Sequence, residues 1–156
     1  APLWGRGNVF LDCLNSQTSF QNNLPNIPMI DPRISGGYDG HMKSRIMYIE
    51  LKTHPGGHDD RGPAWIGRVS FTTSGRTLTY RGKRLQRGNY GYCSNFLDVE
   101  TDEEYWVSGP KKNGEDRYPW ARRTPVEIDD DVQEEYWTKI RNQPDRDKGK
   151  LSQNTY

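Results

Sequence analysis

The sequence predicts a mainly β protein of the α+β class. The expected fold is a small, bent antiparallel sheet or an SH3-like, partly open barrel, with one C-terminal helix. Three observations lead to this prediction. Short segments of alternating apolar and polar residues recur between positions 46 and 107. Turn-forming residues separate these segments, and an apolar stripe with helical spacing appears only near the C-terminus.

The first strand is predicted at 46–53 ("IMYIELKT"), which is rich in β-formers and ends at a proline–glycine turn. A hairpin is predicted at 64–86, where two alternating segments flank the turn "TTSG". One of its faces is apolar and the other is polar and basic, so we expect the second face to meet solvent.

A second hairpin is predicted at 94–112, with the turn "ETDE" and Asp102 or Thr101 at its tip. Of the two, Asp102 better tolerates unusual backbone angles. The terminal helix is predicted within "IDDDVQEEYWTKIRN", where Asp129 or Asp130 can cap the first turn. Its buried stripe consists of residues spaced by four: Val132, Tyr136 and Ile140.

The chain divides by composition into three parts. Residues 1–41 are rich in Asn, Pro, Gly and Ser and are predicted to be an irregular N-terminal extension or a leader. Residues 42–142 are predicted to form a single globular β-rich domain. Residues 143–156 are predicted to be a polar, frayed C-terminal tail.

Charge is unevenly distributed although the formal net charge is only +1. Residues 43–87 carry ten basic and three acidic side chains, whereas residues 88–156 carry ten basic and fifteen acidic ones. This asymmetry indicates either a basic binding face or two halves that attract each other within the fold. No apolar run approaches the roughly 20 residues that a membrane-spanning helix needs, so no membrane association is predicted.

The stretch "HPGGHDDR" at 54–61 gathers the groups most suited to metal binding or acid–base chemistry. A proline and two glycines make a helix unlikely here, so the four-residue spacing of the histidines loses its meaning. We therefore interpret the stretch as a turn between strands. A metal-dependent hydrolase site would require the loop to bring together His54, His58 and either Asp59 or Asp60, with His41 or water as a fourth ligand. Acid–base catalysis would pair His58 with Asp59 or Asp60.

The basic hairpin is the stronger binding candidate, because cations around aromatic rings suit phosphate contacts and base stacking. The alternative is that its cations pair with the acidic segments 98–104 and 127–135, within the domain or across a dimer. The candidate residues for binding nucleic acid or another partner are Arg68, Arg76, Tyr80, Arg81, Lys83, Arg84, Arg87, Lys111 and Lys112.

Cys13 and Cys93 lie far apart without metal-ligand spacing, which favours reduced thiols in a cytoplasmic protein. The aromatic residues in 105–106, at Trp120 and in 136–137 are predicted to join the sheet to the helix in the core. Any one of them could instead anchor a partner.

From Met47 to Arg141 the chain resembles a family of small, uncharacterised bacterial proteins. The resemblance rests on "MYIELKTHPGGHDDRGPAWIGRVSF", "SGRTLTYRGKRLQR", "DVETDEEYWVSGPKKNGEDR" and "PVEIDDDVQEEYW". It implies no established activity. Members are sometimes labelled deoxyxylulose-phosphate synthase, but this chain is far too short for a thiamine-diphosphate enzyme.

Together these patterns predict a bacterial cytoplasmic binding module that is not an enzyme and uses no cofactor. Its expected partner is another protein or a second copy of itself. The alternatives are a nucleic-acid-binding β-barrel that uses the hairpin 68–87 and a metal-dependent hydrolase at 54–60.

Overall fold

The structure is a computed structural model that describes residues 42–55, 57–91, 93–146 and 148–152. The predictions for residues 1–41 lie outside this range. The nine strands in chain order are β1 Lys43–Leu51, β2 Thr53–His54, β3 Gly57–His58, β4 Ala64–Phe71, β5 Thr77–Tyr80, β6 Lys83–Tyr90, β7 Ser94–Asp98, β8 Glu104–Ser108 and β9 Val126–Ile128. The helical turns are η1 Pro119–Ala121, η2 Asp130–Val132, α2 Gln133–Glu135 and η3 Tyr136–Ile140.

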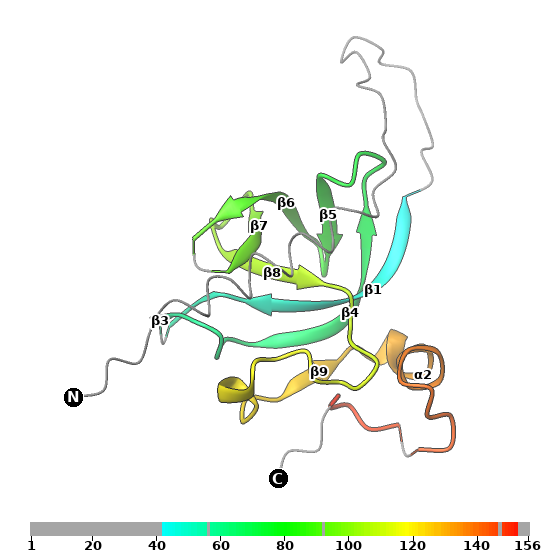
Figure 1. Cartoon of the computed structure of the whole chain (residues 1–156). Helices are drawn as coiled ribbons and strands as arrows, with labels where there is room; N and C mark the ends of the chain where they lie inside the picture. The colour runs from blue at the N-terminus through cyan, green and yellow to red at the C-terminus, as the bar shows by residue number, and fades with distance from the viewer. Residues whose placement is uncertain (1–41, 56, 92, 147, 153–156) are drawn as a thin grey trace, which may run out of the picture. The chain divides into compact units, whose positions relative to one another are not determined.

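Six strands form a closed antiparallel β-barrel in the order β1-β8-β7-β6-β5-β4, and β4 pairs back with β1 (Figure 1). The closing pair is long: its register runs from Lys43 opposite Phe71 to Glu50 opposite Ala64. The predicted mainly β fold with a C-terminal helix is confirmed. Of the two predicted architectures, the structure is the barrel, and the barrel is closed.

The barrel interior is filled by alternate residues of its strands, because successive side chains in a strand point to opposite faces. Ile49 lies opposite Val107, and Leu78 lies opposite Leu85. All four are at most 1% exposed. The two-residue turn after Tyr80 joins β5 to β6 with Arg81 and Gly82 at positive φ, as hairpin turns of this length require.

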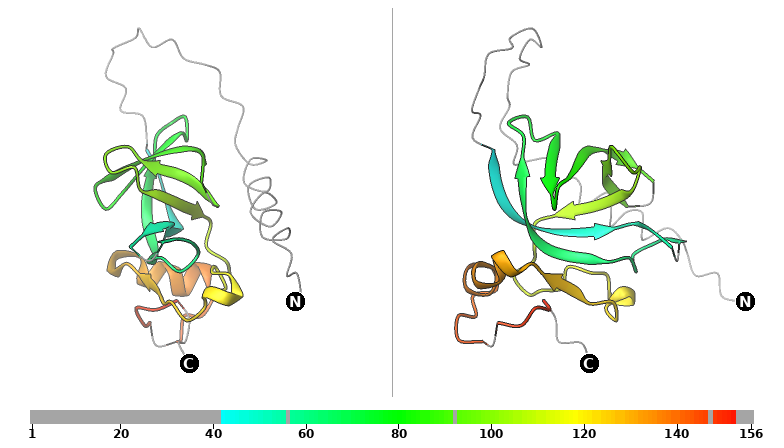
Figure 2. Two further views of the ribbon diagram at one scale, coloured as in Figure 1. Left: turned by 90° about the vertical axis from the view of Figure 1, so that its left-hand side faces the viewer. Right: turned by 180° about the vertical axis from the view of Figure 1, so that it is seen from behind.

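A second layer covers the outer face of β1 and β4 (Figures 1 and 2). Strand β9 runs parallel to β4, with Ala64 opposite Val126, and the helical turns follow it. The solvent-facing second face predicted for the 64–86 hairpin is therefore wrong for β4, because the helical turns pack on it. This layer has its own apolar core, which consists of Tyr48, Ala64, Ile66, Val126, Ile128, Val132, Tyr136 and Trp137.

The predicted terminal helix is confirmed, but its winding changes along its length. A 3-10 turn at Asp130–Val132 leads into one α-helical turn and then into a π-helical turn at Tyr136–Ile140. Val132 and Tyr136 are fully buried, as the predicted stripe requires. The predicted cap is wrong for Asp129, whose side chain makes no capping hydrogen bond and instead accepts from the Tyr80 hydroxyl at 2.9 Å.

The described part of the predicted tail is packed rather than frayed. Leu151 bridges to Glu127 of β9, and the backbone N–H of Ser152 donates to Val126 O at 3.0 Å. The indole N–H of Trp137 donates to Gly149 O at 3.0 Å. Polar residues are held here because their backbone groups complete the hydrogen bonding of β9.

Candidate functional site

The "HPGGHDDR" stretch forms a small hairpin, which confirms its interpretation as a strand-to-strand turn. Strands β2 and β3 pair Thr53 with His58 and His54 with Gly57. Gly57 has a φ of 128°, a conformation that favours glycine. The stretch therefore leaves the end of β1, reverses direction and returns toward β4.

His54 and Asp59 form one pair in this loop. His54 Nε2 lies 2.8 Å from Asp59 Oδ1, and the same oxygen accepts the Arg61 backbone N–H at 2.7 Å. Desolvation alone would raise the pKa of Asp59, but these two hydrogen bonds together lower it. Asp59 is thus an ionised, half-exposed carboxylate that braces the loop.

Of the predicted metal ligands, the structure brings His54 and Asp59 together, whereas Asp60 points to different partners. Its Oδ1 accepts from Lys52 at 2.7 Å and its Oδ2 from the Trp120 indole at 2.9 Å. The side chain of His58 lies outside the described residues. Among the side chains that the structure describes, no three of His, Cys, Asp or Glu are placed to hold a metal ion.

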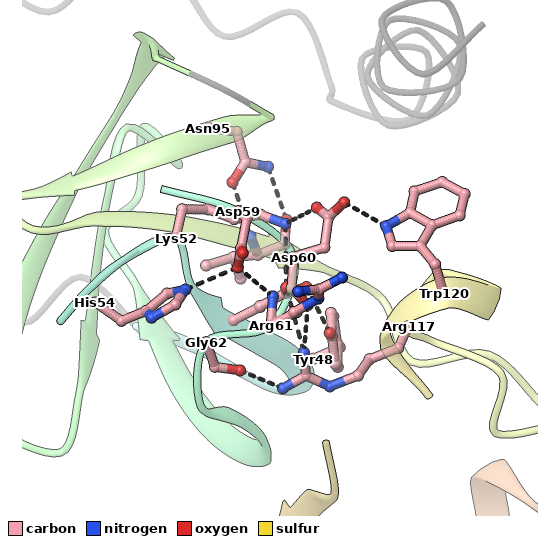
Figure 3. Close-up of polar contacts among 12 residues, drawn as sticks. Tyr48, Lys52, His54, Asp59, Asp60, Arg61, Gly62, Asn95, Arg117 and Trp120 are labelled. Atoms are coloured by element: carbon pink, nitrogen blue, oxygen red, sulfur yellow. Dashed lines mark hydrogen bonds and ion pairs between the residues drawn. The ribbon is translucent and has the colours of Figure 1, made fainter. Parts of the chain in front are cut away.

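Asp60 belongs instead to a buried ionic cluster at the end of β1 (Figure 3). The cluster is composed of two carboxylates and two cations that are each at most 3% exposed: Glu50, Lys52, Asp60 and Arg117. Lys52 Nζ lies 3.1 Å from Glu50 Oε1, and Arg117 Nη1 lies 3.5 Å from the same oxygen. Formal charge is balanced, as burial of ions requires.

Arg117 also fastens the loop backbone. Its Nη1 donates to Asp60 O at 2.7 Å, and its Nη2 donates to Gly62 O. A side chain at position 62 would collide with the carbonyl oxygen of Leu51, so glycine is required by this close approach. Arg117 therefore holds the loop against the end of the barrel.

Tyr48 shields the cluster from the second-layer core. Its hydroxyl donates to Glu50 Oε2 at 2.6 Å. Burial raises the pKa of Glu50, opposed by Lys52 and Arg117. Burial and the neighbouring Glu50 raise the pKa of Tyr48 well above its ordinary value. Tyr48 is therefore a neutral donor at any physiological pH.

Trp120 connects the buried cluster to the surface. It lies in the η1 turn and is 49% exposed. Its ring stacks on Tyr118 with centroids 4.5 Å apart and an interplanar angle of 6°. The prediction that Trp120 belongs to the core is therefore wrong, because the η1 turn holds the ring at the surface while only the indole N–H reaches the buried Asp60.

Three of the six cations of the basic hairpin pair with carboxylates within the domain, as the intramolecular alternative predicted. Arg68 Nη2 donates to Glu135 at 2.6 Å. Arg81 pairs with Asp129, and Lys83 contacts Glu103 at 2.6 Å and Asp98 at 3.0 Å. These pairs join the hairpin to the two acidic segments named from the sequence.

The other hairpin candidates have different environments. Tyr80 is buried, so it is not available to stack on a base. Arg87 is half-buried, with its guanidinium 5.7 Å from the Phe96 ring centroid, and burial lowers its pKa. The remaining cations are exposed: Arg76, Arg84, Lys111 and Lys112.

Cys93 is buried and disulfide-bonded, so the prediction of a reduced thiol at this position is wrong. The corresponding prediction for Cys13 lies outside the described residues. A disulfide is unusual in a cytoplasmic protein.

Sequence reasoning missed Glu50, Lys52 and Arg117. One signal was present, because Glu50 lies in the buried part of β1, on the same face as Tyr48, and Lys52 follows directly after the strand. Charged residues at such positions need buried partners. The partner Arg117 lies 67 positions away in sequence from Glu50, and no local pattern connects the two.

Comparison of the chain with protein-family models, with curated proteins and with solved structures finds no match. The family resemblance therefore stays a prediction. Among the described residues, no helix has the length and apolar character that crossing a bilayer requires.

Proposed function

We propose that this protein is a non-enzymatic interaction module that binds a protein partner through the surface around Trp120. The observation that carries the proposal is the state of this side chain: its ring is half exposed, while its indole N–H is fixed to the buried Asp60. Tryptophan is enriched among the residues that dominate binding energy in protein interfaces.

The buried ionic cluster gives this surface a rigid base. Asp60 is held by Lys52, and the loop backbone is held by Arg117. The Tyr118 ring supports the indole from one side. A side chain that is already ordered loses less conformational entropy when a partner binds it, which favours a docking role for Trp120.

The two alternatives have less support. A nucleic-acid role for the hairpin 68–87 would need free cations, yet Arg68, Arg81 and Lys83 are paired with carboxylates. A low-salt gel shift with DNA and RNA tests that role directly. For the hydrolase alternative, the described residues offer the His54–Asp59 pair but no group of three side chains that could hold a metal ion.

We also propose that the barrel is SH3-like and that the protein is bacterial and cytoplasmic. The disulfide at Cys93 counts against the cytoplasmic part. Binding at Trp120 depends on none of these three properties.

Site-specific photo-crosslinking tests the proposal. The variant Trp120→benzoylphenylalanine is expressed in the native cells and irradiated. The matched control is Thr73→benzoylphenylalanine, at an exposed position in the turn between β4 and β5. We expect a discrete crosslinked protein product from position 120 and none from position 73. Absence of any product from position 120 above the control overturns the proposal, provided that the variant keeps the unfolding midpoint of the native protein.

A further inference from the structure

We propose that the Trp120 surface binds the Val99 turn of a second copy of this chain. The Trp120 surface is defined as Tyr118, Trp120 and the exposed cations Arg61, Arg122 and Arg123. The Val99 turn is defined as residues 99–102, between β7 and β8. This inference rests on the proposed function and identifies the partner that it leaves open.

The exposed apolar side chains point to these two places. Among the described residues, the large hydrophobic side chains that are exposed are Met42, Val99 and Trp120. Met42 is the first described residue. Val99 and Trp120 lie in ordered turns, at 36% and 49% exposure. Single exposed apolar residues are common on protein surfaces, so the case for these two rests on the charges beside them.

Three exposed arginines lie close in sequence to Trp120 or to its partner Asp60. Arg61 directly follows Asp60, the residue that fixes the indole, while Arg122 and Arg123 directly follow the η1 turn. Arg122 has a weak contact with Glu115 at 3.3 Å, in which both side chains are about half exposed. The surface therefore suits a partner that combines an apolar group with carboxylates.

The Val99 turn has that composition. Glu100 and Asp102 are exposed on either side of its tip, and within the described residues neither side chain forms an ion pair. The turn is rigid: Asp102 N–H donates to Asp98 O at 3.0 Å, and Glu100 N–H donates to Asp98 Oδ1 at 3.0 Å. The turn thus carries an exposed apolar side chain followed by two exposed carboxylates.

The other acidic segment is already used within the fold. Its carboxylates pair with cations of the same chain, as in Asp129–Arg81, Asp130–Lys150, Asp131–Arg68, Glu134–Lys148 and Glu135–Arg68. The Val99 turn is therefore the acidic element left available, and it carries the apolar anchor that the 129–135 segment lacks on its exposed side.

A second copy is favoured over a nucleic-acid strand for two reasons. A strand would find one exposed aromatic platform at this surface, where such sites use several. Both halves of the proposed contact, by contrast, are present on each copy of this chain.

Sedimentation equilibrium of the full chain over a concentration series at low ionic strength tests the inference. We expect the weight-average mass to rise with concentration and the rise to weaken in high salt. Trp120→Ala should raise the dissociation constant about tenfold or more. The matched control, Arg76→Glu with Lys43→Glu, reverses two exposed cations outside the Val99 turn and the Trp120 surface and should leave the association unchanged.

Charge reversal identifies the two surfaces. Arg122→Glu with Arg123→Glu should weaken association, and so should Glu100→Arg with Asp102→Arg. The protein that carries all four changes should regain most of the affinity, because the charges are again opposite. Urea midpoints confirm that each variant folds.

A chain that stays monomeric at every concentration overturns the inference, as does a folded four-change protein that fails to recover. Crosslinking from position 120 to a different protein, together with a monomeric chain, would overturn this inference while leaving the proposed function intact.

Discussion

At the scale of single residues, the unusual feature of this protein is the burial of four charges at the end of β1. Removing an ion from water costs several kcal/mol, and a close partner of opposite charge offsets that cost only when its geometry is good. Here Lys52 contacts both Asp60 at 2.7 Å and Glu50 at 3.1 Å. The cluster therefore stabilises the fold only while every member is present.

We expect Asp60→Asn to be strongly destabilising, because it leaves the buried Lys52 with one fewer anionic partner. The free energy of unfolding should fall by about 3–5 kcal/mol, the range for breaking a buried ion pair. The matched control is Asp59→Asn, which loses a half-exposed contact with His54 and should cost at most about 1 kcal/mol. Urea denaturation measures both. Equal losses for the two variants would show that the cluster contributes no more than a surface pair.

At the scale of elements, β9 depends on a segment that looks dispensable in the sequence. Residues 148–152 are polar, yet Ile128 N–H donates to Lys150 O at 2.7 Å and Ser152 N–H donates to Val126 O at 3.0 Å. Arg141 Nη1 also donates to Ser152 O at 2.7 Å. The segment therefore satisfies backbone groups on the outer side of β9 and ties them to the helical turns.

We expect deletion of residues 147–156 to lower the free energy of unfolding by about 2–5 kcal/mol, because several hydrogen bonds of about 1 kcal/mol each are lost together. The matched control deletes only residues 153–156 and keeps every hydrogen bond described above. Denaturation curves of the two proteins provide the comparison. If the longer deletion were as stable as the shorter one, the segment would not support β9.

Also at this scale, the sequence predicted local features well and long-range contacts poorly. Alternation located the strands, and turn chemistry located Asp102, whose φ of 58° is the conformation expected at its tip. The prediction of a frayed C-terminal tail was wrong for residues 148–152, because polar composition does not reveal backbone hydrogen bonding. The hydrogen bond of the Asp129 side chain to Tyr80, 49 positions away, was equally invisible.

At the scale of the whole molecule, barrel closure depends on the pairing of β1 with β4. An alternating sequence pattern is the same in an open sheet and in a closed one, so the sequence left both possible. The same limit applies to the site. Trp120 and Asp60 are 60 positions apart. From the "HPGGHDDR" stretch alone, Asp60 was a candidate metal ligand, whereas in the structure it accepts the hydrogen bond of the Trp120 indole.

Asp116 should make the stability of the whole molecule depend on pH. Burial raises the pKa of this carboxyl to about 6, and the Lys111 backbone N–H and the charge of Arg141 oppose the shift only in part. Oδ1 accepts from Lys111 N–H at 2.7 Å, whereas Oδ2 is buried without a hydrogen-bond partner among the described residues. In the unfolded chain an aspartate has a pKa near ~3.9.

Folding therefore takes up a proton at Asp116 between about pH 4 and pH 6, and the stability that the neutral carboxyl contributes is lost as pH rises through this window. A shift of about two units corresponds to at most about 3 kcal/mol.

We expect Asp116→Asn to match the native protein below about pH 4 and to exceed its unfolding free energy by up to that amount at pH 7. Glu115→Gln, at an exposed neighbour, is the control and should show no such trend. Urea denaturation from pH 3.5 to 8 gives the difference between native and variant at each pH, so that the other titrating groups cancel. A difference that stays constant over this range would show that Asp116 ionises in the folded protein as it does in the unfolded chain.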